Sequence, residues 1–139
     1  MRYWLISLPR PDLEHCIKIH CFGLNRKYIL GKLQVDDRIV CCASKEWKII
    51  ALGHATSGHY LDTEKKFLSD GLFPDRFDIV ASKFEARHEC SLIEVLDKLS
   101  FIKNLAYWSV YFRNGIVEIA RSDWESIEAL ATRMQTATK

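Results

Sequence analysis

Cysteine, histidine and serine side chains can bind metals or attack substrates, and their spacing in this chain argues against both uses. Cys16 and His20 stand one helical turn apart, as two ligands of one metal ion would. No second pair follows at ligand spacing, because the neighbours Cys41 and Cys42 would point to opposite faces of a strand. We therefore expect no metal site, and we expect buried, free cysteines instead.

The sequence also lacks a recognisable catalytic motif. Ser44, Ser57 and the five histidines lie outside any Gly-x-Ser-x-Gly context, and there is no glycine-rich phosphate loop. The carboxylate pairs at residues 36–37 and 75/78 fit turn and strand-surface positions. We therefore expect a protein that is not an enzyme and that needs no cofactor.

Periodic apolar segments indicate the elements that would position any site. Short apolar runs bounded by turn residues predict strands, with those around Val40, Ile50, Ile79 and Val110 in one curved sheet. The predicted strands cover residues 3–8, 38–43, 48–57, 76–84, 108–113 and 116–119, the last two joined by an Asn-Gly hairpin turn. Residues 12–20 predict a helix, and capping boxes at residues 91–94 and 122–125 open two more. This mixture places the fold in the α+β class.

Bulk composition limits the function further. The 139 residues can close one core, so we expect a single domain over residues 1–139. A net charge of only +2 argues against strong non-specific binding of nucleic acid, although residues 1–58 hold nine Lys or Arg against five Asp or Glu. An odd set of five cysteines without a paired framework suits a reducing compartment. With no transmembrane run, we expect an intracellular, cytoplasmic monomer that does not bind membranes.

Several motifs, taken in order, resemble the EVE domain. They are residues 2–8 (RYWLISL), 22–25 (FGLN), 47–56 (WKIIALGHAT), 73–79 (FPDRFDI) and 101–104 (FIKN) with Trp108-Ser109. One departure is Asp36-Asp37, where the family carries Gly-Asp, and we expect this turn to be kept with some strain. The resemblance implies a PUA-like fold, with a curved mixed β-sheet or open barrel and short flanking helices, which EVE domains share with YTH domains.

The resemblance also implies a pocket that holds a modified base of DNA or RNA between aromatic rings. Phe22 stands where the YTH cage has a Trp. Further walls are expected from Tyr60, Phe73 and Trp108, and Asn25 and Ser44 would read the edge of the base. By contrast, Trp4, Phe77, Phe101 and Trp124 are assigned to the core, and Trp47 fits either place.

Basic residues would hold the nucleic-acid backbone beside this pocket. The candidates are Arg26, Lys27, Lys45, Lys48 and Arg76. Arg76 has an alternative, structural role, which is to tie a carboxylate such as Asp62 to the start of its strand.

These expectations lead to a first hypothesis, a non-catalytic reader of a modified base, and to two rivals. One rival is a small PUA-like, ASCH-type hydrolase acting on a modified nucleoside. The other is a module that binds a small ligand or a protein. The absence of a catalytic constellation favours the reader or the binding module over the hydrolase.

Overall fold

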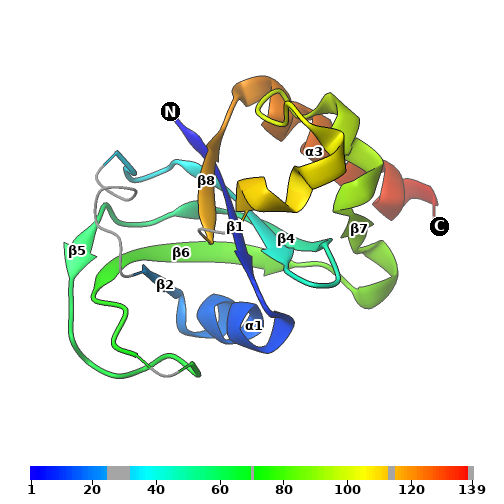
Figure 1. Ribbon diagram of the computed structural model, residues 1–139. Helices are drawn as coiled ribbons and strands as arrows, with labels where there is room; N and C mark the ends of the chain where they lie inside the picture. Colours follow the sequence, from blue (N-terminus) through cyan, green and yellow to red (C-terminus); the bar gives the residue numbers. More distant parts are fainter. Residues whose placement is uncertain (25–31, 70, 113–114, 138–139) are drawn as a thin grey trace.

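A computed structural model describes residues 1–24, 32–69, 71–112 and 115–137 of the chain. Its centre is a curled mixed sheet that forms a half-barrel, in the spatial order β2-β6-β4-β3-β1-β8 (Figure 1). The six strands on this path are β1 (Tyr3–Leu8), β2 (Cys21–Leu24), β3 (Arg38–Ala43), β4 (Lys48–Ala55), β6 (Asp75–Lys83) and β8 (Ile116–Ile119). Two short strands join it, β5 (Tyr60–Leu61) beside β6 and β7 (Cys90–Ser91) beside β4. Only β1 and β3 pair in parallel among these described strands.

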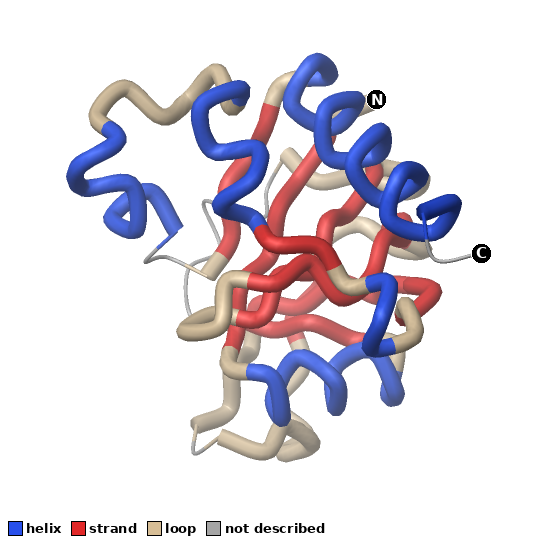
Figure 2. Tube along the Cα trace, turned by 90° about the vertical axis from the view of Figure 1, so that its right-hand side faces the viewer, coloured by secondary structure: helices blue, strands red, loops and turns tan. Residues whose placement is uncertain are grey.

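Helices cover both faces of the sheet (Figure 2). The helix α1 (Arg10–Ile19) lies on one face, and α3 (Arg121–Ala137) lies on the other with the short 3₁₀ helices η1 (Ala86–His88), η2 (Leu92–Lys98) and η3 (Leu105–Phe112) nearby. None of the described helices is both long and apolar enough to cross a membrane. The mixed strands and flanking helices confirm the predicted α+β class and the PUA-like curved sheet.

Successive side chains along the strands point to opposite faces of the sheet, and apolar side chains build a hydrophobic cluster on each face. Ile39 and Cys41 of β3 join the cluster under α1, while Val40 and Cys42 join the cluster under α3. This alternation follows from the period of two in a strand. It confirms that the adjacent cysteines point to opposite faces, and all five cysteines are free and buried.

The helix α1 begins two residues before the predicted segment, residues 12–20, and ends one residue before its end. Pro11 lies in its first turn, where a missing N–H costs nothing, and His20 closes it in the left-handed conformation with φ of 60°. Leu13 and Cys16 face the sheet and are buried. The helix is therefore fixed directly beside the end of β1 and the start of β2.

The turn before β3 combines a strained residue with a buried carboxylate. Asp36 has a φ of 74°, which fits the strain expected where the resembled family has glycine. Asp37 is only 3% exposed and accepts hydrogen bonds from the Trp4 indole N–H and from the backbone N–H groups of Arg2 and Gln34, each at 3.0 Å. This carboxylate joins the start of β1 to the turn, a role that the sequence analysis missed.

One predicted strand is wrong. Residues 105–112 form the 3₁₀ helix η3, with a kink at Tyr107, so Val110 lies outside the sheet and is half exposed. Aromatic residues at helical spacing explain the difference, because Trp108, Tyr111 and Phe112 pack together onto the cluster under α3. The segment predicted as a helix from Ser91 is likewise the 3₁₀ helix η2, and Ser91 makes no side-chain cap bond there.

Candidate functional site

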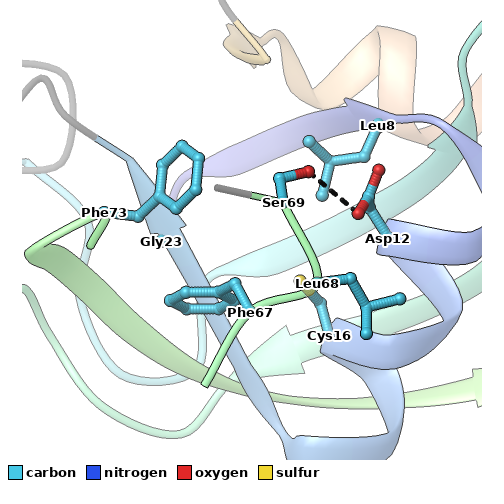
Figure 3. A pocket seen from close by; sticks show the side chains of 8 residues that line it. All are labelled: Leu8, Asp12, Cys16, Gly23, Phe67, Leu68, Ser69 and Phe73. Atoms are coloured by element: carbon cyan, nitrogen blue, oxygen red, sulfur yellow. Dashed lines mark hydrogen bonds between the residues drawn. The ribbon is translucent and has the colours of Figure 1, made fainter. Parts of the chain in front are cut away.

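A small cavity of about 40 Å³ lies where α1, the ends of β1 and β2, and residues 67–73 meet. Its lining consists of two phenylalanines, two leucines and four smaller or polar residues: Leu8, Asp12, Cys16, Gly23, Phe67, Leu68, Ser69 and Phe73. Figure 3 shows the two phenylalanines and Gly23 on one side, and Leu8, Asp12, Cys16 and Leu68 on the other. The site therefore has an aromatic wall opposite an aliphatic wall with a carboxylate on it.

The aromatic wall is an edge-to-face pair. The ring centroids of Phe67 and Phe73 are 5.8 Å apart, and the ring planes meet at 89°. Gly23 allows this arrangement, because a Cβ atom there would lie 2.8 Å from two Phe67 ring atoms and 2.9 Å from the Phe73 carbonyl oxygen. Only glycine fits between the strand β2 and this pair of rings.

The fully buried side chain of Arg76 fixes the segment that carries the aromatic wall. Its guanidinium donates to the carbonyl oxygens of Phe73 at 3.0 Å and Leu72 at 2.8 Å, and also to the carbonyl of Glu64. Asp62 lies 3.2 Å from Nη1, an ion-pair distance, although this nitrogen has no aligned hydrogen-bond acceptor in the described part of the chain. The guanidinium carbon also lies 5.0 Å from the Phe67 ring centroid. Arg76 therefore ties residues 62–73 to strand β6.

Polar groups at the cavity could recognise a ligand but are poorly suited to attack one. The Ser69 hydroxyl donates to the Asp12 carboxylate at 3.0 Å, a pair drawn in Figure 3. Burial raises the pKa of the Cys16 thiol to about 12, with smaller contributions from Cys21 and Asp12. The thiol is therefore protonated at neutral pH, and a protonated thiol is a poor nucleophile.

A second, larger cleft of about 460 Å³ lies beside the cavity and shares Leu8 with it. Its lining comes from the end of β1, the β3–β4 turn and η3, and comprises Ser7, Leu8, Leu24, Ser44, Trp47, Ser109, Phe112 and Gly115. Trp47 packs edge-on against Trp108, with ring centroids 4.9 Å apart. Hence Ser44 belongs to this second cleft, and Trp108 supports one of its walls.

Phe22 is not where the sequence analysis expected it. Its ring is fully buried and packs against Phe77 across β2 and β6, with ring centroids 5.4 Å apart. The position that the resemblance assigns to a cage residue is thus filled by a core phenylalanine, because alternation on β2 turns residue 22 inward. The core assignments of Trp4, Phe77 and Trp124 agree with their burial, and Phe101 is partly buried against the cluster under α3.

Among the described residues, Phe73 is the one other predicted pocket residue that lines the small cavity. Tyr60 instead donates a 2.6 Å hydrogen bond to Asp78 and lies 3.5 Å from the Cys21 sulfur. Burial, followed by the hydrogen bond to Asp78, raises the pKa of this phenol. Asn25 lies outside the described residues.

Of the predicted basic residues that the structure describes, Arg76 does not share a mouth with Lys45 and Lys48. Arg76 is buried and structural, which corrects its assignment as a phosphate ligand and agrees with its alternative role toward Asp62. Lys45 and Lys48 are exposed on the turn that carries Ser44 and Trp47. Arg26 and Lys27 lie outside the described residues.

Sequence reasoning missed the side chain that completes the aromatic wall. Phe67 lies in a charged segment, residues 63–69, which carries neither strand nor helix periodicity. A single aromatic residue among charges, a few residues before Phe73, was the available signal. Within the described ranges, no three His, Cys, Asp or Glu side chains cluster.

Comparisons with known proteins identify the fold. No protein-family model matches the sequence, and no curated protein matches it. Solved structures do match: a hypothetical protein from Leishmania major aligns with a TM-score of 0.71 and 14% identity over 97% of both chains. Rpa0253 from Rhodopseudomonas palustris aligns with a TM-score of 0.66 and 14% identity over 95% of this chain and 94% of its own.

A YTH domain is also among these structures. The Mmi1 YTH domain, solved in complex with RNA, aligns with a TM-score of 0.68 and 13% identity over 99% of this chain and 81% of its own. The fold is YTH-like. At these identities the likeness shows the fold alone, and membership in the EVE family is not confirmed.

Proposed function

We propose that this protein is a non-catalytic nucleic-acid reader that holds one unpaired, modified base in the cavity between Phe67 and Phe73. The observation that carries the proposal is the aromatic pair itself, held beside Gly23 by a buried arginine. Support also comes from the fold, because the Mmi1 YTH domain was solved with RNA on the same architecture. The site differs from the one expected around Phe22.

The chemistry of the walls suits a flat base with a small apolar substituent. A base stacked on one aromatic ring gains about 1–3 kcal/mol. A methyl group placed against Leu8, Leu68 and Cys16 would add roughly 0.8 kcal/mol for its buried carbon. The Asp12 carboxylate accepts hydrogen bonds, which suits the exocyclic amine of adenine or cytosine.

The size of the cavity requires the rings to move. A volume of about 40 Å³ holds a few water molecules and no base. A base would therefore enter by parting the rings of Phe67 and Phe73, which contact each other only edge to face. The base must also leave its own stack, so single strands are the preferred ligand.

The hydrolase alternative lacks a reactive group at this cavity. The thiol of Cys16 is held protonated by burial, and Asp12 is engaged by Ser69. A reader needs neither group to react, only to contact the base.

Binding to short oligonucleotides tests the proposal. Fluorescence anisotropy would compare seven-residue single strands of RNA and DNA whose central base is adenine, N6-methyladenine, cytosine or 5-methylcytosine, with matching duplexes. We expect a methylated single strand to bind tightest, and Phe67→Ala to weaken it by roughly 5- to 150-fold, the value of one stacking face. Tyr107→Ala, which removes an exposed ring outside the cavity, is the matched control and should change nothing.

Two results would refute the proposal. One is equal affinity for single strands and duplexes, and the other is unchanged affinity in a Phe67→Ala protein shown to be folded by circular dichroism.

A further inference from the structure

The cleft between Trp47 and Phe112 has no role in a protein that binds a single base in the small cavity. Its volume of about 460 Å³ falls within the range of ligand pockets, whereas the cavity beside it is far smaller. We propose that this cleft is a second subsite, which holds the nucleotide next to the recognised base in the same single strand. This inference rests on the proposed function, because it places a second nucleotide relative to the first.

Adjacency supports the assignment. Leu8, at the end of β1, lines both hollows. Gly23 and Leu24 are consecutive residues of β2, and one lines the cavity while the other lines the cleft. Because Leu8 lines both, the two hollows meet at this side chain. A strand with one base in the cavity would therefore reach the cleft with its next nucleotide.

The aromatic surface supports it as well. Trp47 is partly exposed, and its ring meets Trp108 in a T-shaped arrangement at 4.9 Å and Phe112 in a tilted one at 5.6 Å between centroids. Because the ring is partly exposed, part of its surface is open to stacking. Trp47 also has a φ of 54°, a left-handed conformation that is costly for a bulky residue. The turn thus maintains a strained conformation with this ring at the cleft.

Polar groups around the ring match a nucleotide. The hydroxyls of Ser44 and Ser109 and the indole N–H of Trp47 make no hydrogen bond to the described part of the chain. They are therefore available to a base edge or a sugar hydroxyl.

Charge on the same turn favours an anionic ligand. Lys45 and Lys48 are exposed on either side of the segment that carries Trp47, and neither forms an ion pair with a described carboxylate. Nearby Glu46 is engaged by Arg10, which lowers the pKa of this carboxylate through a hydrogen bond and keeps it paired. The turn therefore presents two exposed cations to a phosphate, of which Lys48 also interacts electrostatically with Glu46.

The test compares one nucleotide with two. The probes are N6-methyladenosine 5′-monophosphate and the two ribodinucleotides in which an unmodified adenosine precedes or follows it, with the unmethylated forms as controls. Titration of the ¹⁵N-labelled full chain by NMR gives each affinity and reports on the indole N–H of Trp47, assigned from Trp47→Phe. The indole of Trp4, buried and bonded to Asp37, is the internal control.

We expect one dinucleotide to bind roughly 5- to 150-fold tighter than the mononucleotide, and to shift the Trp47 indole signal while that of Trp4 stays in place. Trp47→Ala should abolish this gain and leave the mononucleotide affinity unchanged, whereas Phe67→Ala should weaken both probes.

The failures of the two proposals are distinguishable. If Phe67→Ala weakens the mononucleotide but no dinucleotide gains affinity or shifts the Trp47 signal, the second subsite is refuted and the reader stands. If Phe67→Ala leaves the affinity of every probe unchanged, both proposals are refuted. Because the indole signal is measured on the unmodified protein, this outcome does not depend on whether Trp47→Ala folds.

Discussion

Replacing Gly23 by alanine tests whether the cavity depends on close contact between β2 and the aromatic wall. The added Cβ would lie 2.8 Å from the Phe67 ring and 2.9 Å from the Phe73 carbonyl oxygen, well inside ordinary contact distance. Overpacking of this kind costs about 1–3 kcal/mol, and the stiffer unfolded chain returns about 0.4–1 kcal/mol. We therefore expect a net loss of about 1–2 kcal/mol in the free energy of unfolding, together with weaker binding of the single strand.

Gly58→Ala is the matched control. A Cβ there would meet only the Leu33 carbonyl oxygen, at 3.5 Å, so this variant should be as stable as the natural protein or slightly more stable. Urea unfolding followed by circular dichroism gives both free energies, and anisotropy gives the affinity of the methylated strand.

A second substitution separates the two clashes. Phe67→Leu removes the ring atoms nearest the new Cβ but leaves the Phe73 carbonyl in place. In a double-mutant cycle, Gly23→Ala should therefore cost less in the Phe67→Leu background than in the natural protein. Equal stability of Gly23→Ala and Gly58→Ala, or a cost that Phe67→Leu does not change, would show that the wall is not packed against β2 as described.

Three further predictions concern the core and the charged groups. Phe22→Ala should lose about 3–5 kcal/mol of stability in urea unfolding, with unchanged affinity per folded molecule, and a stable variant with weakened binding would return Phe22 to the site. Arg76→Met should lose about 3–5 kcal/mol in the free energy of unfolding, because three backbone carbonyls lose their hydrogen-bond donor. Asp62→Ala, which removes only the ion pair with Arg76, should lose less than about 1 kcal/mol. Equal losses in the two variants would contradict this ranking. Burial raises the pKa of the Cys42 thiol from 9.0 to about 12, so the stability that this protonated thiol contributes is complete below pH 9 and is lost between pH 9 and 12. Across this window, the unfolding free energy of Cys42→Ala should fall less steeply than that of the natural protein, by about 1.4 kcal/mol per pH unit. An identical slope would refute the raised pKa of Cys42.

Sequence patterns predicted the strands well where alternation and turn residues agreed. The strands β1 and β3 occupy the predicted residues, 3–8 and 38–43. Prediction failed at residues 108–113, where an apolar run before Asn-Gly suggested a hairpin strand. Trp108, Tyr111 and Phe112 pack onto the cluster under α3 from the 3₁₀ helix η3, and this long-range packing is not visible in a short sequence window.

The candidate site was predictable only in part. The segment at residues 22–25 was expected beside the pocket, but no strand was predicted there, and the ring of Phe22 was assigned to the pocket. In the structure, Phe22 turns into the core and Gly23 leaves room for Phe67. Which side of a short strand faces a cavity depends on register, and the register of β2 with β6 cannot be read from four residues.

Arg76 contacts the segment before it mainly through backbone carbonyls, those of Glu64, Leu72 and Phe73. Every amino acid carries a backbone carbonyl, so the attachment does not depend on which side chains the segment bears. Substitutions at exposed positions such as Leu68 can therefore change the surface that a ligand contacts without changing the backbone conformation of the segment. Exposed positions of this segment, such as Leu68, are therefore suitable places to randomise when new binding specificities are selected on this scaffold.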